Sequence, residues 1–204
     1  MGKITSISLQ KNHKDRINIF VDDEFFMGVS LELVYKFALK KDMEIDPKTL
    51  QDLIEENQKV EGLNKGIGYC SKNIKTESQV KKYLFDKQYP AKVVYYVLDK
   101  LKEYKYIDDE AFVKRYIEST SNRQGKRLSK YKLLQKGVKS DVVERVSCEV
   151  DVDSYSSARK IAEKYMKNKE STKENLAKTY RYLIGKGFSY EDVNKVISEF
   201  KVDE

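Results

Sequence analysis

Three short segments of this sequence recur at almost equal spacing, and this repeat constrains the fold more than any other feature. They are Lys87-Gln88-Tyr89, Lys136-Gly137-Val138 and Lys186-Gly187-Phe188, which begin 49 and 50 residues apart. A leucine stands three positions before each lysine, and valines stand seven and ten positions after it. Each segment predicts a helix with a basic end, a left-handed turn and a new helix with apolar anchors. Gln88 replaces glycine in the first segment, so we expect strain or a different turn there.

Apolar residues recur at every third or fourth position after residue 61, which predicts helices throughout this part of the chain. We expect nine of them, over residues 63–74, 77–87, 91–103, 109–122, 128–136, 141–149, 155–168, 173–185 and 190–200. Thr76 and Gln79 are spaced as a capping box at the start of the second helix. Three helices are too few to bury their apolar faces, so neighbouring repeats must stack. The expected fold is therefore mainly α, with three tandem three-helix repeats (61–104, 105–153 and 154–204) in an elongated array.

Residues 1–60 have a different pattern, which predicts a small β-rich unit. Apolar and polar residues alternate around Ile7–Leu9 and Ile17–Val21, and Phe25–Val29 forms a third expected strand. Ser30 is placed to cap a short helix at its N-terminus, and Asp46-Pro47 is placed to begin a second one. This N-terminal unit thus combines strands with two short helices.

The composition argues against several classes of protein. The chain has 204 residues with a single histidine, His13, and two cysteines, so we expect no histidine-based zinc site, catalytic triad or disulfide framework. The sequence has no apolar run long enough for a transmembrane helix. It also has no secretory signal. It also lacks a phosphate-binding loop, metal-ligand spacing or an activated nucleophile. We therefore expect a cytoplasmic protein that is not an enzyme and uses no metal or cofactor.

The positive charge of the chain is concentrated in its middle. The formal net charge is +7 overall, −2 over residues 1–60, +8 over 61–150 and +1 over 151–204. Between residues 111 and 139 there is one acid, Glu118, and there are nine basic residues: Lys114, Arg115, Arg123, Lys126, Arg127, Lys130, Lys132, Lys136 and Lys139. Such a stretch can bind nucleic-acid phosphates by counterion release, or attract an acidic protein. The alternative is a solvated helix face whose neutralising acids lie elsewhere in the fold; we favour a binding surface.

Local patterns refine this expectation. Arg123–Arg127 reads as a loop between helices with three cations and a glycine, so its amides and guanidinium groups can approach phosphates or carboxylates. Asp108-Asp109-Glu110 places negative charge at a helix N-terminus, which favours capping over a metal or acid–base site. Phe112 and Tyr116 are four residues apart, and we expect them to face the core rather than to stack on bases.

The order of these motifs resembles the RecX family of recombination regulators over essentially the whole chain. The residues that carry the resemblance are Lys75–Val80, Tyr106–Phe112, Gly125, Arg127, Leu133, Lys136-Gly137-Val138, Leu183 and Lys186-Gly187-Phe188. The β-containing leader resembles that of longer members from Gram-positive bacteria. The chain departs from the family at Val113, where members often have alanine, and at Gln88.

The resemblance implies a regulator of homologous recombination and DNA repair, linked to the SOS response. Such a protein binds the RecA recombinase filament on single-stranded DNA and inhibits its ATPase, strand exchange and growth. We expect a monomer without membrane association, with weak and salt-dependent contact to single-stranded DNA through the nine cations. A helix-turn-helix transcription factor is the alternative, because three-helix units can hold that motif. Such factors usually dimerise on two half-sites, and the sequence has no evident dimerisation seam.

Overall fold

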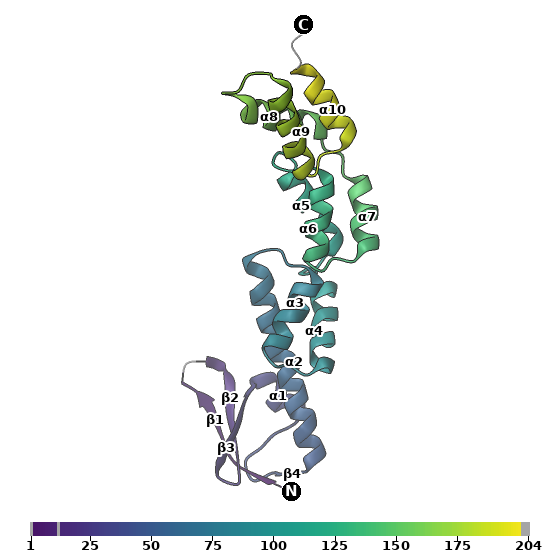
Figure 1. Ribbon diagram of the computed structural model, residues 1–204. Helices are drawn as coiled ribbons and strands as arrows, with labels where there is room; N and C mark the ends of the chain where they lie inside the picture. The colour runs from purple at the N-terminus through teal and green to yellow at the C-terminus, as the bar shows by residue number, and fades with distance from the viewer. Residues whose placement is uncertain (1, 12, 201–204) are drawn as a thin grey trace. The chain divides into compact units, whose positions relative to one another are not determined.

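The computed structural model describes residues 2–11 and 13–200. This part of the chain contains a four-stranded sheet and ten helices (Figure 1), and it forms two compact units. Unit 1 lies within residues 1–73 and 80–106, and unit 2 lies within residues 74–79 and 107–204. The prediction of a mainly α fold with a small β-rich N-terminal part is confirmed.

The sheet of unit 1 is antiparallel, with strand order β3-β2-β1-β4. Its strands are β1 (Gly2–Gln10), β2 (His13–Val21), β3 (Glu24–Ser30) and β4 (Glu44–Ile45). Ile19 of β2 lies opposite Ile7 on one side and Met27 on the other, so apolar side chains line up across the sheet. The sequence predicts the first three strands but not β4, because two residues are too few to show an alternating pattern.

The helices of unit 1 include one long helix that the sequence does not predict. They are α1 (Leu31–Lys36), α2 (Pro47–Lys72), most of α3 (Glu77–Asp86) and α4 (Ala91–Glu103). The caps at Ser30 and Asp46 are confirmed, since both side chains accept hydrogen bonds from backbone N–H groups of the next turn. The prediction of two separate helices, one after Pro47 and one over 63–74, is wrong, because α2 is continuous. The expected boundary at residues 60–61 lies inside this helix.

Close packing explains why α2 continues through its glycines. A Cβ atom at Gly62 would lie 3.2 Å from Val97 Cγ2, and one at Gly66 would lie 2.8 Å from Leu101 Cδ1. The glycines therefore bring α2 against α4, and this packing offsets their poor helix propensity. Beside the sheet, α1 and α2 complete a separate core of eight buried residues: Ile4, Ile17, Ile19, Val29, Leu33, Leu39, Ile45 and Leu53.

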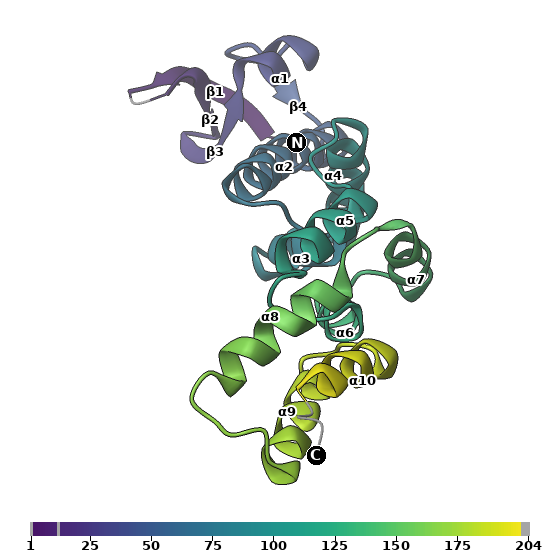
Figure 2. The same ribbon diagram turned by 90° about the horizontal axis from the view of Figure 1, so that it is seen from above.

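Unit 2 holds two three-helix repeats (Figure 2), and each of them has its own apolar core. The second repeat consists of α5 (Asp109–Thr120), α6 (Lys126–Gln135) and α7 (Ser140–Glu149). The third consists of α8 (Ser154–Met166), α9 (Lys173–Gly185) and α10 (Tyr190–Glu199). The predicted ends of these six helices lie within two residues of the observed ones.

The recurring turn is confirmed at Gly137 and Gly187, and the same turn rather than a different one forms at Gln88. Gln88, Gly137 and Gly187 have φ angles of 62°, 79° and 85°, so the glutamine adopts the same left-handed conformation as the two glycines. The recurring apolar anchors are all 0% exposed: Leu84, Val94, Val97, Leu133, Val143, Val146, Leu183, Val193 and Val196. The sequence repeat is thus a repeat of backbone turn and core contacts.

Two helix starts in unit 2 lie directly against glycine turns. At the start of α3, Thr76 Oγ1 donates a hydrogen bond of 2.8 Å to the carbonyl of Lys136, which precedes the turn at Gly137. At the start of α6, the N–H of Gly125 donates one of 2.9 Å to the carbonyl of Lys186, which precedes the turn at Gly187. In both cases the carbonyl before a glycine turn accepts a hydrogen bond from a helix start, from a side-chain hydroxyl at α3 and from a backbone N–H at α6, where the bond joins the second repeat to the third.

Candidate functional site

All nine cations of the expected binding surface lie in the second repeat, and we call them the basic cluster. Helix α5 carries Lys114 and Arg115, the next loop carries Arg123, α6 carries Lys126, Arg127, Lys130 and Lys132, and the α6–α7 turn carries Lys136 and Lys139. Five of them are exposed and the other four are partly buried. The cluster therefore follows one repeat from its first helix to the start of its third.

Carboxylates neutralise only a small part of this charge. Lys114 lies 3.4 Å from Glu149, and Lys130 pairs with Glu144. Glu110 instead accepts a hydrogen bond of 2.6 Å from Arg145, which raises the pKa of that guanidinium. Within residues 2–11 and 13–200, the other seven cations of the cluster form no ion pair with a carboxylate. The surface of the second repeat thus keeps an excess of positive charge.

Two cations of the cluster also hold the fold together. Lys126 Nζ donates hydrogen bonds of 3.3 and 2.6 Å to the carbonyls of Ser147 and Val150, at the C-terminal end of α7. A cation there also interacts favourably with the helix dipole. Arg127 Nη2 donates one of 2.8 Å to the carbonyl of Ile184 at the end of α9. The expected loop over Arg123–Arg127 is thus too long, because its last two residues form the first turn of α6, and the segment is a structural junction as well as a source of charge.

A buried amide fixes a third cation. The side chain of Gln124 is buried, and its Nε2 donates a hydrogen bond of 2.9 Å to Ser129 Oγ. Its Oε1 accepts one of 2.6 Å from Lys132 Nζ, which holds that ammonium beside the loop. The ammonium of Lys136 lies 5.8 Å from the ring centroid of Tyr116, so the α6–α7 turn approaches α5.

Three exposed cations remain nearly free of such contacts. Arg123 Nη2 donates a local hydrogen bond of 3.2 Å to the carbonyl of Ser119. In the part of the chain that the structure describes, the side chains of Arg115 and Lys139 make neither an ion pair nor a hydrogen bond. These three side chains are therefore available to an external partner without loss of an interaction between helices.

The acidic and aromatic residues of the second repeat have structural roles. Asp108 Oδ1 accepts a hydrogen bond of 2.9 Å from the N–H of Ala111, which confirms capping. Phe112 and Tyr116 pack against the core of the repeat, as expected. Among the described residues, no three His, Cys, Asp or Glu side chains gather as metal ligands. The expectation of no histidine-based zinc site or triad rests on His13, whose side chain lies outside the described ones.

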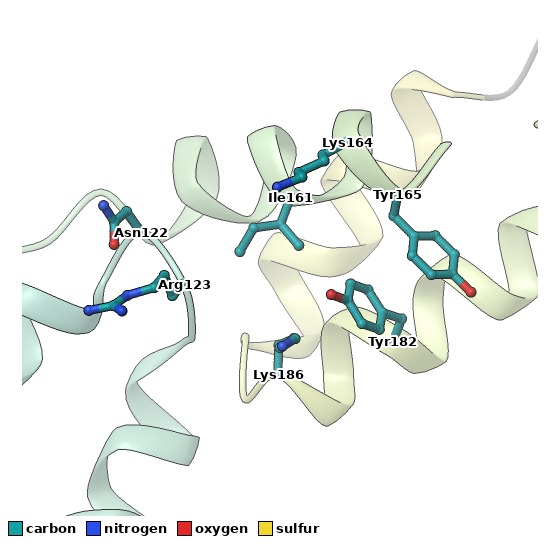
Figure 3. A pocket seen from close by; sticks show the side chains of 7 residues that line it. All are labelled: Asn122, Arg123, Ile161, Lys164, Tyr165, Tyr182 and Lys186. Atoms are coloured by element: carbon teal, nitrogen blue, oxygen red, sulfur yellow. The ribbon is translucent and has the colours of Figure 1, made fainter. Parts of the chain in front are cut away.

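A pocket in unit 2 brings one predicted residue together with several that the sequence reading missed (Figure 3). Its volume is about 460 Å³, and its lining consists of Asn122, Arg123, Ile161, Lys164, Tyr165, Tyr182 and Lys186. The rings of Tyr165 and Tyr182 stack with centroids 4.5 Å apart. Lys186 belongs to the third repeat segment, which the sequence predicts as a turn, and Tyr182 belongs to a tyrosine pair of the sequence for which packing was favoured over recognition.

Comparison with known families matches three parts of the chain. Residues 2–46 match the Regulatory protein RecX N-terminal domain, residues 108–146 match the second three-helix domain of RecX, and residues 151–197 match the third. Regulatory protein RecX of Clostridium tetani (strain Massachusetts / E88) is 38% identical over 205 residues, which cover 98% of this chain and 94% of that protein. The chain belongs to the RecX family.

Other RecX proteins agree with this assignment. Regulatory protein RecX of Clostridium perfringens (strain 13 / Type A) is 32% identical over 100% of this chain and 99% of its own. A crystal structure of regulatory protein RecX has a TM-score of 0.77 and 26% identity, covering 98% of this chain and 100% of that one. RecX from Lactobacillus salivarius, with a TM-score of 0.66, 21% identity and 71% of this chain covered, supports the fold alone.

The family assignment locates the site within RecX architecture. The basic cluster lies on the second three-helix domain of RecX, and the pocket is formed between that domain and the third. The chain is accordingly a regulatory protein of the RecX family, built on the three-helix domains of that family. No helix among the described residues has the length and apolar character needed to span a membrane.

Proposed function

We propose that this protein binds the filament that the RecA recombinase forms on single-stranded DNA, and that it inhibits the filament's ATPase activity, strand exchange and growth. Family membership supports a regulatory role. The observation that carries the proposal is the basic cluster, in which seven of nine cations have no carboxylate partner among the described residues. An excess of exposed positive charge attracts an anionic assembly at long range and contributes many salt-sensitive contacts.

The contacts within the fold identify which cations are suited to bind a partner. Lys126 and Arg127 bond to backbone carbonyls of neighbouring helices, so part of their effect on binding comes through the fold. Arg115 and Lys139 are exposed and make no such bonds to the residues that the structure describes. We therefore assign direct contact with the filament first to Arg115 and Lys139, and next to Arg123, whose bond to the carbonyl of Ser119 is local.

The test is a titration of the protein into RecA on single-stranded DNA, with ATPase rate and filament length followed together. We expect the wild-type protein to lower both. In the double variant Arg115→Glu/Lys139→Glu, half-inhibition should require at least about tenfold more protein. The new glutamates repel the anionic filament, and exposed charges of this kind act mainly on the association rate. The difference should shrink as salt is added, because exposed charges are screened.

A matched control reverses two exposed lysines of unit 1. Lys40 and Lys41 lie between α1 and β4, and Lys40→Glu/Lys41→Glu changes the net charge by the same amount. Circular dichroism first verifies that both variants are folded. Inhibition unchanged in the Arg115/Lys139 variant, or reduced equally in the control, would rule out the cluster as the contact. No effect of the wild-type protein on RecA at stoichiometric amounts would rule out the function itself.

A further inference from the structure

The pocket between the second and third repeats has a lining that is basic and aromatic at once. Arg123, Lys164 and Lys186 supply three cations, and Asn122 supplies an amide. The other three lining residues are Ile161 and the two stacked tyrosines, and none of the seven is acidic. A single pocket therefore offers charged donors for an anion next to apolar and aromatic surface.

The tyrosine pair contacts one donor of this pocket, Lys186, and one lysine outside it. The Lys186 ammonium lies 5.3 Å from the Tyr182 centroid, and Lys169 covers the ring of Tyr165 at 3.2 Å. In Figure 3 the hydroxyl of Tyr182 points into the pocket, with Lys164 and Lys186 on either side of it. The guanidinium of Arg123 points away from this hydroxyl, consistent with its bond to the carbonyl of Ser119. The convergent donors are thus Lys164, Lys186 and Tyr182.

We propose that this pocket binds single-stranded DNA, with Lys164 and Lys186 on backbone phosphate oxygens and the Tyr182 hydroxyl donating to one of them. Grooves that bind single strands combine cations that track the backbone with aromatic and apolar surface for sugars and bases. An acidic peptide would use the cations alone, whereas a nucleotide also uses the wall formed by Ile161 and Tyr182, since Lys169 and Tyr182 cover the faces of the Tyr165 ring. The site extends the proposed function, since single-stranded DNA is part of both, but it acts without RecA.

A second pocket of unit 2 fits such a ligand less well. It has a volume of about 440 Å³ and includes Lys126, Arg127 and Asp192 in its lining. The carboxylate of Asp192 opposes an anion there, and Arg127 is already bonded to the carbonyl of Ile184. The pocket at Lys164 and Lys186 is therefore the better site for a phosphate.

The test measures binding of a fluorescein-labelled oligothymidylate by fluorescence anisotropy, without RecA, over a series of salt concentrations. The slope of log K against log salt changes by about 0.7 for each phosphate contact to a single strand. We expect Lys164→Gln/Lys186→Gln to make the slope about 1.4 less steep and to weaken binding at low salt at least tenfold. Tyr182→Phe keeps the ring stacked and removes the hydroxyl, and it should weaken binding about threefold.

The matched control is Lys40→Gln/Lys41→Gln, which removes the same charge from unit 1. It should keep the wild-type slope. A wild-type slope in Lys164→Gln/Lys186→Gln, or an equal change in the control, would overturn the proposal. Duplex DNA competing as well as the single strand would also overturn it. Because Arg115 and Lys139 remain intact in these variants, loss of DNA binding with retained inhibition of RecA separates this site from the basic cluster.

Discussion

The second and third repeats share a backbone turn but fill their cores in opposite ways. Three buried positions differ: Val113, Ile117 and Val138 in the second repeat, and Ala158, Ala162 and Phe188 in the third. Where the first helix of the repeat carries small residues, the residue after the turn is large. Protein cores tolerate exchanges that conserve total volume. The turn is therefore the same in both repeats, and the sizes of the core side chains around it vary together.

A buried hydroxyl shows a second difference between the two repeats. Ser129 of α6 and Thr179 of α9 lie fifty residues apart, and both are buried. Ser129 accepts a hydrogen bond from Gln124, whose other end holds Lys132. Thr179 instead contacts Met166 Sδ of α8 at 3.0 Å and donates a hydrogen bond of 2.8 Å to the carbonyl of Asn175 on its own helix. Only in the second repeat does this hydroxyl belong to a network that fixes a cation, which agrees with the binding role proposed for that repeat.

The largest expected effect tests the exchange of core volume. Phe188→Ala should lower the free energy of unfolding by about 4 kcal/mol, because it leaves a large cavity between small alanines. Val138→Ala removes fewer atoms from a core that already holds larger neighbours, and about 2 kcal/mol is expected. Urea unfolding followed by circular dichroism measures both. Equal losses in the two variants would show that the third repeat does not depend more than the second on the residue after the turn.

A close backbone approach at the junction gives the next effect. A Cβ atom at Gly125 would overlap the carbonyl oxygen of Gly187, and backbone atoms relax little. Gly125→Ala should therefore destabilise the protein by about 3 kcal/mol through overpacking. Gly185→Ala is the matched control. Gly185 is the last residue of α9, and a Cβ atom there would meet open space, so this substitution should be neutral or slightly stabilising. A mild effect at Gly125, similar to that at Gly185, would show that the two repeats separate easily at this junction.

Local signals in the sequence predicted much of this fold. The turn at Gly137 and Gly187, the buried leucines and valines around it and the capping residues all depend on neighbours within about ten positions. Gln88 followed the same turn despite its side chain, because the flanking core contacts repeat as well. The continuous helix α2 was missed, since its glycines are stabilised by Val97 and Leu101, more than thirty residues away.

The candidate site was predicted by residue type but not by role. A count of charges along the sequence found the basic cluster. It did not show that Arg127 bonds to the carbonyl of Ile184, 57 residues later, and so has a structural role. The pocket was missed because Lys164 and Lys186 belong to a region with a net charge of +1, where nearby acids cancel the count. Only the fold separates these cations from the acids, as Glu163 pairs with Arg159. Charge summed along a chain thus finds clusters on one repeat more readily than sites between repeats.

The smallest expected effect concerns how the third repeat begins. Asp153 accepts a hydrogen bond from the N–H of Ser156, and Ser156 holds the pKa of that carboxyl below its ordinary value. Because the pKa is lower in the folded state, the cap contributes stability above the unfolded pKa of about 3.9. This contribution is lost as the pH falls through the folded pKa.

Asp153→Asn retains an oxygen that can cap α8 but no longer titrates. We therefore expect its urea midpoint to fall less than that of the wild-type protein between pH 6 and pH 3. Asp151→Asn is the control, since Asp151 is an exposed acid of the same loop and caps no helix. If it reduces the acid sensitivity as much as Asp153→Asn does, general charge repulsion rather than the cap governs this end of the third repeat. If only Asp153→Asn does so, the acid response of the third repeat originates at the start of α8.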